Sequence, residues 1–76
     1  KEVRTKNRIE AVYDLVKANP RITYKEIMET LQIGYSSVYE SIKQLKRQGI
    51  LSREGGLYGG YWKLNEDLYF QLYPRN

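Results

Sequence analysis

Between Asn19 and Leu51 the chain reads NPRITYKEIMETLQIGYSSVYESIKQLKRQGIL. Thr23 and Glu26, three residues apart, fit a capping box, in which each side chain binds the backbone amide of the other residue at the start of a helix. Apolar side chains follow at helical spacing: Tyr24, Ile27, Met28 and Leu31. This pattern predicts a short amphipathic helix that begins after Thr23 and ends before a tight connection at 32–34.

Another helix, the third in chain order, is predicted over residues 35–48 of the same stretch. Val38, Ile42 and Leu45 lie on one side at helical spacing and form its expected buried face. Gly34 precedes the helix as an N-cap, which is tolerated but less specific than serine or threonine. Gly49 follows it and is placed for a C-terminal cap in the left-handed conformation.

A further helix is predicted on the N-terminal side, over residues 7–19. Asn7 and Glu10 fit a capping box, and Pro20 ends the helix because the residue before proline is pushed out of the helical region. The apolar positions recur at helical spacing, with Leu15 widening the arc: Ile9, Val12, Tyr13 and Val16.

On the C-terminal side the periodicity changes to that of strands. Residues 50–53 and 61–64 read as two short strands joined by a glycine-rich loop. Trp62 and Leu64 are expected to point inward, and Tyr61 and Lys63 outward. In the tail, residues 65–76, Asn65 could cap a last short helix, although a strand is also possible. The predicted fold class is mainly α with a small β-hairpin, in one domain spanning 1–76 with a core over 1–64.

From residue 8 to residue 51 the chain resembles the winged helix-turn-helix domains of bacterial and archaeal transcription regulators, the broad group that contains the MarR, PadR, ArsR and Lrp families. The matching positions are 19–23, 26–27, 31–34, 36–39, 42, 45 and 49–51. The hairpin that ends at Leu64 falls where this family carries its wing. The resemblance implies binding to double-stranded DNA, with the N-terminal part of the third helix in the major groove.

Composition narrows the range of functions. The chain has 76 residues, a net charge of +4 and neither cysteine nor histidine. Their absence removes disulfides, the usual transition-metal sites and the commonest catalytic base, so we expect no enzyme activity, no cofactor and no metal. A basic balance favours a polyanionic partner, and no apolar run is long enough to cross a bilayer, so no membrane association is expected. The expected location is the cytoplasm, at the nucleoid.

The candidate DNA-contacting residues lie in three groups. On the third helix they are those facing away from the predicted core or near the helix start: Tyr35, Ser36, Ser37, Tyr39, Glu40, Lys43 and Arg47. At the start of the second helix, where free backbone amides bind phosphate, they are Arg21, Thr23, Tyr24 and Lys25. In the wing they are Arg53, Tyr58 and Lys63, which are expected on the backbone or in the minor groove.

Each group also has a plainer interpretation. The third helix could present an ordinary solvated face with a Glu40–Lys43 pair, and Thr23 could cap its own helix and do nothing else. The wing could be a mobile surface hairpin whose glycines only permit the turn. Glu40 stands where the family commonly has a basic residue. A carboxylate is unfavourable near phosphates unless it accepts from a cytosine amino group or pairs with Lys43 or Arg47. Trp62 is interpreted as core rather than as a platform for stacking bases. Tyr35, Tyr39, Tyr58 and Tyr61 remain candidate platforms.

The resemblance leads to the hypothesis of a sequence-specific DNA-binding regulator, either a transcription repressor or a plasmid or virus maintenance protein. Two alternatives stay open. A winged helix also serves as a protein-interaction module, and Glu40 favours that interpretation. Because the chain begins at Lys1 rather than at methionine, it could also be the DNA-binding piece of a larger replication or recombination protein.

The tail is rich in large apolar and aromatic residues: Leu68, Tyr69, Phe70, Leu72 and Tyr73. On a monomer these residues would either form an exposed apolar patch or fold back on the first helix. We predict that they form a homodimer contact, since two-fold pairing reads two DNA half-sites. Fold-back is the alternative.

Overall fold

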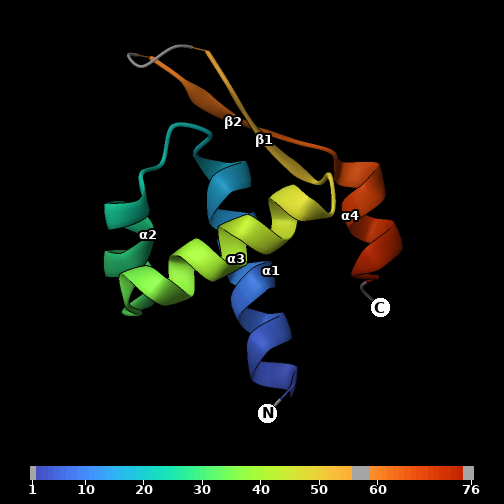
Figure 1. Cartoon of the computed structure of the whole chain (residues 1–76), viewed down its shortest axis with the longest axis horizontal. Coiled ribbons are helices and arrows are strands. Elements are labelled where there is room, and N and C mark those ends of the chain that lie inside the picture. Colours follow the sequence, from blue (N-terminus) through green and yellow to red (C-terminus); the bar gives the residue numbers. More distant parts are fainter. Residues whose placement is uncertain (1, 56–58, 75–76) are drawn as a thin grey trace.

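The computed structural model describes residues 2–55 and 59–74, with side chains from residue 8 onward. Its elements, in chain order, are α1 (Glu2–Ala18), α2 (Tyr24–Leu31), α3 (Tyr35–Arg47), β1 (Leu51–Glu54), β2 (Tyr61–Leu64) and α4 (Glu66–Leu72). In Figure 1, α3 crosses in front of α1. The helices α2 and α4 lie at opposite ends of α3, and the β1–β2 hairpin lies above it. The predicted class, mainly helical with a small hairpin, is confirmed.

The boundaries of two elements differ from the prediction. α1 begins at Glu2, so the predicted capping box at Asn7 and Glu10 is wrong and Asn7 lies inside the helix. Neither proline nor glycine precedes Asn7, so nothing in the sequence stops the helix from extending backwards. The first strand begins at Leu51 because the amide of Ile50 is used elsewhere: it donates to the carbonyl of Leu45 and closes the end of α3.

The helix-turn-helix stretch forms as its sequence predicts. The amide of Glu26 donates to Thr23 Oγ1 (3.1 Å), and the amide of Thr23 donates to Glu26 Oε1 (2.9 Å), which confirms the capping box. Gly34 is the N-cap of α3 and offers no side-chain cap. Gly49 follows α3 in the left-handed conformation at φ 81°, where a side chain would be strained.

The core lies where α1, α3, the hairpin and α4 meet, and it contains Ile9, Val12, Tyr13, Val16, Ile22, Ile27, Val38, Ile42, Leu45, Ile50, Leu51, Trp62, Tyr69 and Tyr73. The predicted buried faces of α1 and α3 are confirmed. α2 contributes less than predicted: Ile27 is fully buried, whereas Tyr24, Met28 and Leu31 are half-buried. As a helix of eight residues on the flank of α3, it has only one side chain that reaches the interior.

The C-terminal tail forms a helix that folds back onto the domain. Asn65 caps α4 by accepting a hydrogen bond from the amide of Leu68 (3.1 Å). The ring of Tyr69 stacks on that of Tyr13 in α1, with centroids 3.5 Å apart and planes within 2°. Tyr73 is also buried and reaches α3, where its hydroxyl donates to Gln48 Oε1 (2.9 Å).

Candidate nucleic-acid interface

The outer face of α3 is polar and faces solvent. Its inner side is buried through Val38, Ser41, Ile42 and Leu45. Six of the seven α3 residues predicted to contact DNA are exposed: Tyr35, Ser36, Tyr39, Glu40, Lys43 and Arg47. The seventh, Ser37, is half-buried, and its carbonyl accepts from the hydroxyl of the buried Ser41 (2.9 Å). Among the α3 residues predicted to contact DNA, only Ser37 is not exposed.

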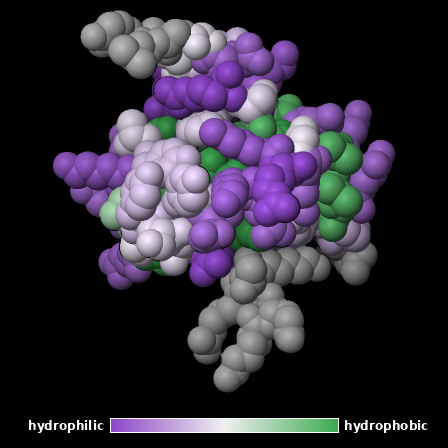
Figure 2. All heavy atoms as spheres, in the orientation of Figure 1, coloured by the Kyte–Doolittle hydropathy of each residue, from purple (hydrophilic) through white to green (hydrophobic). Residues whose placement is uncertain are grey.

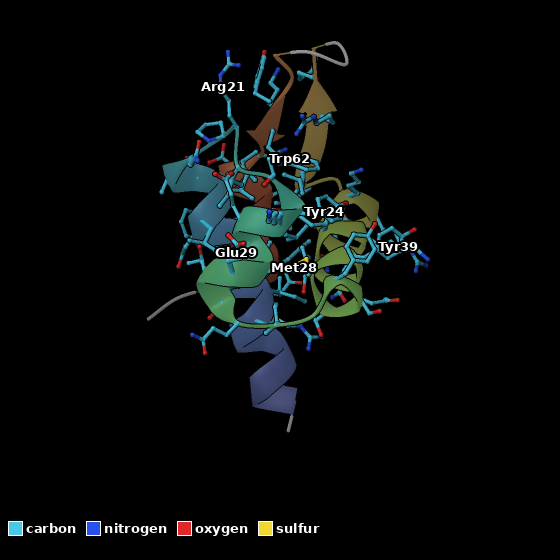
Figure 3. The ribbon with its side chains drawn as sticks, turned by 90° about the vertical axis from the view of Figure 1, so that its left-hand side faces the viewer. Arg21, Tyr24, Met28, Glu29, Tyr39 and Trp62 are labelled. Carbon is cyan, nitrogen blue, oxygen red and sulfur yellow. The ribbon has the colours of Figure 1, made fainter. Side chains whose placement is uncertain are left out.

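An aromatic run joins α3 to the hairpin. It consists of Tyr39, Tyr35, Tyr24 and Trp62, with successive ring centroids 6.1, 5.6 and 6.2 Å apart. The two α3 rings of the run are exposed, Tyr39 to 43% and Tyr35 to 56%, whereas Trp62 at its other end is only 6% exposed. Figure 3 shows Tyr24 between Trp62 and the α3 side, where Tyr39 lies. The outer rings are accessible to a ligand, whereas Trp62 belongs to the core, as predicted.

The wing is fixed to the helices through Trp62 in its second strand. The amide of Trp62 donates to the carbonyl of Pro20 (2.7 Å), and the indole Nε1 donates to the carbonyl of Ile22 (2.9 Å). Both carbonyls belong to the loop between α1 and α2. The position of the hairpin next to the helix-turn-helix is thus set by hydrogen bonds as well as by packing.

The two described wing cations lie on opposite faces of the hairpin. Arg53 pairs across the strands with Trp62, and Lys63 pairs with Ser52. Because paired residues share a face and neighbours alternate, Arg53 lies on the inner face with Trp62, and Lys63 lies on the outer face. The structure brings Arg53 to the α3 side but does not bring Lys63 there. Tyr58 lies outside the described residues.

Three cations lie over rings of the aromatic run. Lys43 Nζ lies 5.9 Å from the centroid of Tyr39, Lys46 Nζ lies 5.4 Å from that of Trp62, and Arg53 Cζ lies 4.8 Å from that of Trp62. Cations are attracted to the negative faces of aromatic rings at such distances. Lys46 was absent from the residues predicted from sequence. It lies two helical turns beyond Tyr39 on the same side, and this spacing was the signal that could have found it.

The start of α2 carries exposed residues at the edge of this surface. Thr23 and Lys25 are exposed, and Tyr24 is half-buried. Arg21 is exposed and donates from Nη1 to the carbonyl of Gly59 in the wing (3.4 Å). The guanidinium thus links the loop before α2 to the hairpin, a contact between residues far apart in sequence.

Burial and the nearby hydroxyls of Tyr35 and Tyr39 raise the pKa of Tyr24 above its ordinary value of 10.0, and Arg53 opposes part of this rise. Burial disfavours the charged phenolate, and a neighbouring guanidinium favours it. The Tyr24 hydroxyl is therefore a neutral hydrogen-bond donor at physiological pH.

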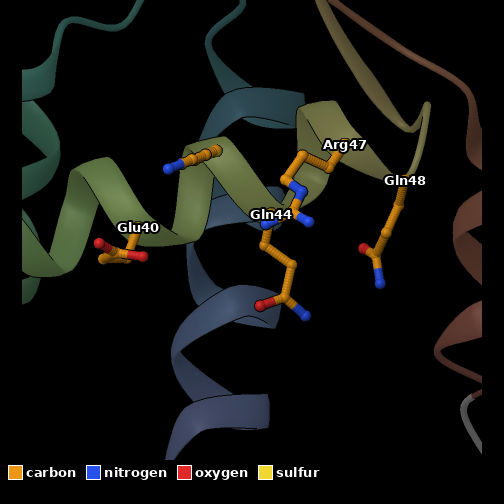
Figure 4. Close-up of a pocket in the computed structure, with 5 residues that line it drawn as sticks. Glu40, Gln44, Arg47 and Gln48 are labelled. Carbon is orange, nitrogen blue, oxygen red and sulfur yellow. The ribbon is translucent and has the colours of Figure 1, made fainter.

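A shallow polar groove of about 390 Å³ runs along the C-terminal half of α3. It is lined by Glu40, Lys43, Gln44, Arg47 and Gln48, as Figure 4 shows. All five residues belong to α3 or to its C-cap, so the groove is part of the exposed helix face rather than an enclosed effector cavity. Gln44 Nε2 donates to the hydroxyl of Tyr73 (3.2 Å), which joins the end of this groove to the chain after α4.

The sequence of this chain was compared with those of known protein families. The family described as winged helix-turn-helix DNA-binding matches residues 7–52. The chain belongs to this winged helix-turn-helix family. The search of curated proteins and the search of solved structures returned no match.

The family match covers most of α1, all of α2 and α3, and the start of β1. The winged helix-turn-helix domain is a DNA-binding domain, so DNA is the partner that the family supports. In the described part of the chain, no group of acidic side chains is arranged to hold a metal ion, and no helix is both long and apolar enough to span a membrane.

Proposed function

We propose that this domain binds double-stranded DNA in a sequence-specific manner and acts as a transcription regulator, most simply a repressor. α3 would lie in the major groove with Tyr35, Ser36, Tyr39, Glu40 and Lys43 near base edges. The observation that carries the proposal is the exposed, mostly polar outer face of α3 beside the inner-face cation Arg53. The three exposed cations of α3, Lys43, Lys46 and Arg47, supply attraction to phosphate.

The wing and the start of α2 would bind the backbone on either side of α3. Arg53 reaches toward the minor groove or its edge, where the potential is most negative. Arg21, Thr23 and Lys25 are exposed at the start of α2, where a phosphate contact is compatible with the capping box. In this arrangement Lys63, on the outer face of the hairpin, contributes least.

Two measurements test the proposal. Titration against random duplex DNA should show that the logarithm of affinity falls linearly with the logarithm of salt concentration, as release of counterions from phosphates requires. Selection from a random duplex library should then return a defined sequence. Failure to bind any duplex at low salt would end the proposal, and binding without enrichment of a sequence would reduce it to a non-specific DNA-binding function.

A protein-interaction function is the second candidate, and Glu40 is the observation that favours it. An exposed carboxylate in the middle of α3 is repelled by phosphates and would suit a basic protein surface. Glu40→Gln separates the two functions. If the domain binds DNA, the substitution should strengthen binding to random duplex at low salt and weaken the base preference at one position of the selected site. A protein-binding domain should show neither effect.

We also propose that the domain forms a homodimer through the exposed side of α4. Leu68 is half-buried, whereas Phe70 and Leu72 are 44% and 47% exposed at the surface of α4. Figure 2 shows hydrophobic side chains gathered on the α4 end of the molecule. Tyr69 and Tyr73 serve the core of the same chain, so they are not free to contact a second copy, and that part of the predicted contact is corrected.

The dimer is tested without disturbing the core by Phe70→Gln combined with Leu72→Gln. Sedimentation of the parent chain at micromolar concentration, with and without DNA, should show a dimer, and the double variant should sediment as a monomer with an unchanged melting temperature. A monomeric parent chain under both conditions would rule the dimer out.

A further inference from the structure

Trp62 has a single orientation because both of its polar groups are engaged. Its amide donates to Pro20 and its indole Nε1 to Ile22, at 2.7 and 2.9 Å. The residue is 6% exposed, yet it is the inward partner of an exposed arginine on the neighbouring strand. The indole ring is therefore a fixed surface on the inner face of the wing.

Two cations from different elements converge on this ring. Lys46 comes from the last turn of α3 and lies 5.4 Å from the centroid, and Arg53 comes from β1 and lies 4.8 Å from it. Both side chains are exposed while the ring is buried, so their charged ends face solvent. Within the described part of the chain, no carboxylate lies within 4.0 Å of either charge.

Two like charges over one ring repel each other, and the negative face of the ring offsets only part of this repulsion. An anion bound by both cations would remove it. The donor set also favours phosphate, since a guanidinium presents paired N–H groups and an ammonium presents a compact charge. The Tyr24 ring lies 6.2 Å from that of Trp62 and adds a neutral hydroxyl donor near Arg53.

We propose that Trp62 is a positioning residue that holds Lys46 and Arg53 as one phosphate-binding pair at the junction of α3 and the wing. This inference rests on the proposed function. If α3 occupies the major groove and the wing the adjacent minor groove, the strand that separates the two grooves crosses this junction. The ligand is then a phosphodiester of that strand. Because the ring already restricts the rotamers of the two cations, less side-chain entropy is lost when they bind it.

The test compares Trp62→Phe with Trp62→Leu. Both variants lose the indole hydrogen bond to Ile22, but only phenylalanine keeps an aromatic face for the cations. Below the melting temperatures of both variants, Trp62→Phe should bind duplex within about twofold of the parent affinity, and Trp62→Leu should lose about tenfold. Equal loss in the two variants would mean that Trp62 acts only through stability.

A second set of variants does not depend on the core. Lys46→Gln, Arg53→Gln and their combination change exposed residues, and each single change should lower the salt slope by about one unit. The losses should be non-additive in the double variant because the two side chains share a ligand. Lys17→Gln is the matched control, since Lys17 lies at the end of α1 and pairs with Glu66 at 3.5 Å.

Trp62 is the only tryptophan, so its fluorescence reports on this site directly. Excited where tyrosine does not absorb, it should change when duplex is added to the parent chain and should not change in the Lys46→Gln, Arg53→Gln double variant. Additive losses of affinity in the double variant, together with unchanged Trp62 fluorescence when duplex is added to the parent chain, would overturn this inference while leaving DNA binding intact. Failure of the parent chain to bind any duplex would overturn the proposed function and this inference together.

Discussion

The ring of Tyr24 in α2 contacts that of Trp62 in the wing, and the surroundings of its hydroxyl raise its pKa. Burial is the largest cause of its raised pKa, followed by the hydroxyls of Tyr35 and Tyr39. A raised pKa means that the folded chain holds this proton more tightly than the unfolded chain. The resulting stability is fully present below pH 10, the unfolded value, and is lost as the pH rises through the folded value.

We therefore predict that Tyr24→Phe flattens the alkaline end of the stability profile. Phenylalanine keeps the ring packing and has no proton to lose, so the free energy of unfolding should fall less steeply above about pH 10 than in the parent chain. Denaturant unfolding at a series of pH values measures this. Tyr61→Phe is the control on an exposed ring, and an identical effect from both variants would contradict the assignment.

Lys43 lies over the ring of Tyr39 on the exposed face of α3. We predict that Lys43→Ala weakens duplex binding and lowers the salt slope by about one unit, because one phosphate contact is lost. The melting temperature should stay nearly constant, since the side chain is exposed. Lys17→Ala removes the same charge from α1. Equal affinity in both variants would place the DNA-binding surface away from α3.

At the scale of elements, α3 is a two-sided helix. Its inner side carries Val38, Ile42 and Leu45, each fully buried, and its outer side carries the polar groove and the two exposed rings of the aromatic run, those of Tyr35 and Tyr39. The buried Ser41 is compatible with the inner side because its hydroxyl donates to Ser37 and accepts from Arg8 Nε in α1. One helix thus holds the core together and presents the candidate interface.

We predict that Ile42→Ala lowers the free energy of unfolding by about 2–5 kcal/mol, because it removes buried methyl groups and leaves a cavity. Glu40→Ala, two residues earlier on the outer side, should change it by no more than about 0.5 kcal/mol. Chemical denaturation of both variants gives the comparison. Equal stability of the two variants would mean that the buried and exposed sides of α3 are assigned incorrectly.

For the whole molecule, α4 and the residue that follows it are part of the core. The stacked rings of Tyr13 and Tyr69 fix it on α1, and Tyr73 ties it to α3 through Gln44 and Gln48. A cut after Asn65 therefore removes two buried rings. It would destabilise the domain whatever the oligomeric state is.

We predict that Tyr69→Ala costs about 3–5 kcal/mol, the usual loss for a large buried aromatic side chain. Tyr69→Phe should keep most of the stability because the ring can still stack on Tyr13. Thermal unfolding of the two variants decides this. A small loss in the alanine variant would mean that α4 contributes little to the fold and leaves its side chains free for a partner.

The sequence by itself determined the helix-turn-helix. The capping box at Thr23, the spacing of Val38, Ile42 and Leu45, and the left-handed glycine at position 49 are local signals, each read within one or two helical turns. The outer face of α3 follows from the same spacing, because burying one side of a helix exposes the other. Local signals failed at Asn7, where a good cap was overridden by residues that simply continue the helix.

Only the tertiary structure decided what depends on contacts between distant residues. Sequence periodicity left α4 open between a helix and a strand, and between fold-back and a partner; the stack of Tyr69 on Tyr13 joins residues far apart in the chain. Lys46 and Arg53 came to lie over the same ring only when the hairpin packed beside α3, with Arg53 on β1 and Trp62 on β2. Such contacts are set by how the packed elements fit together, and a single sequence holds no periodic signal for them.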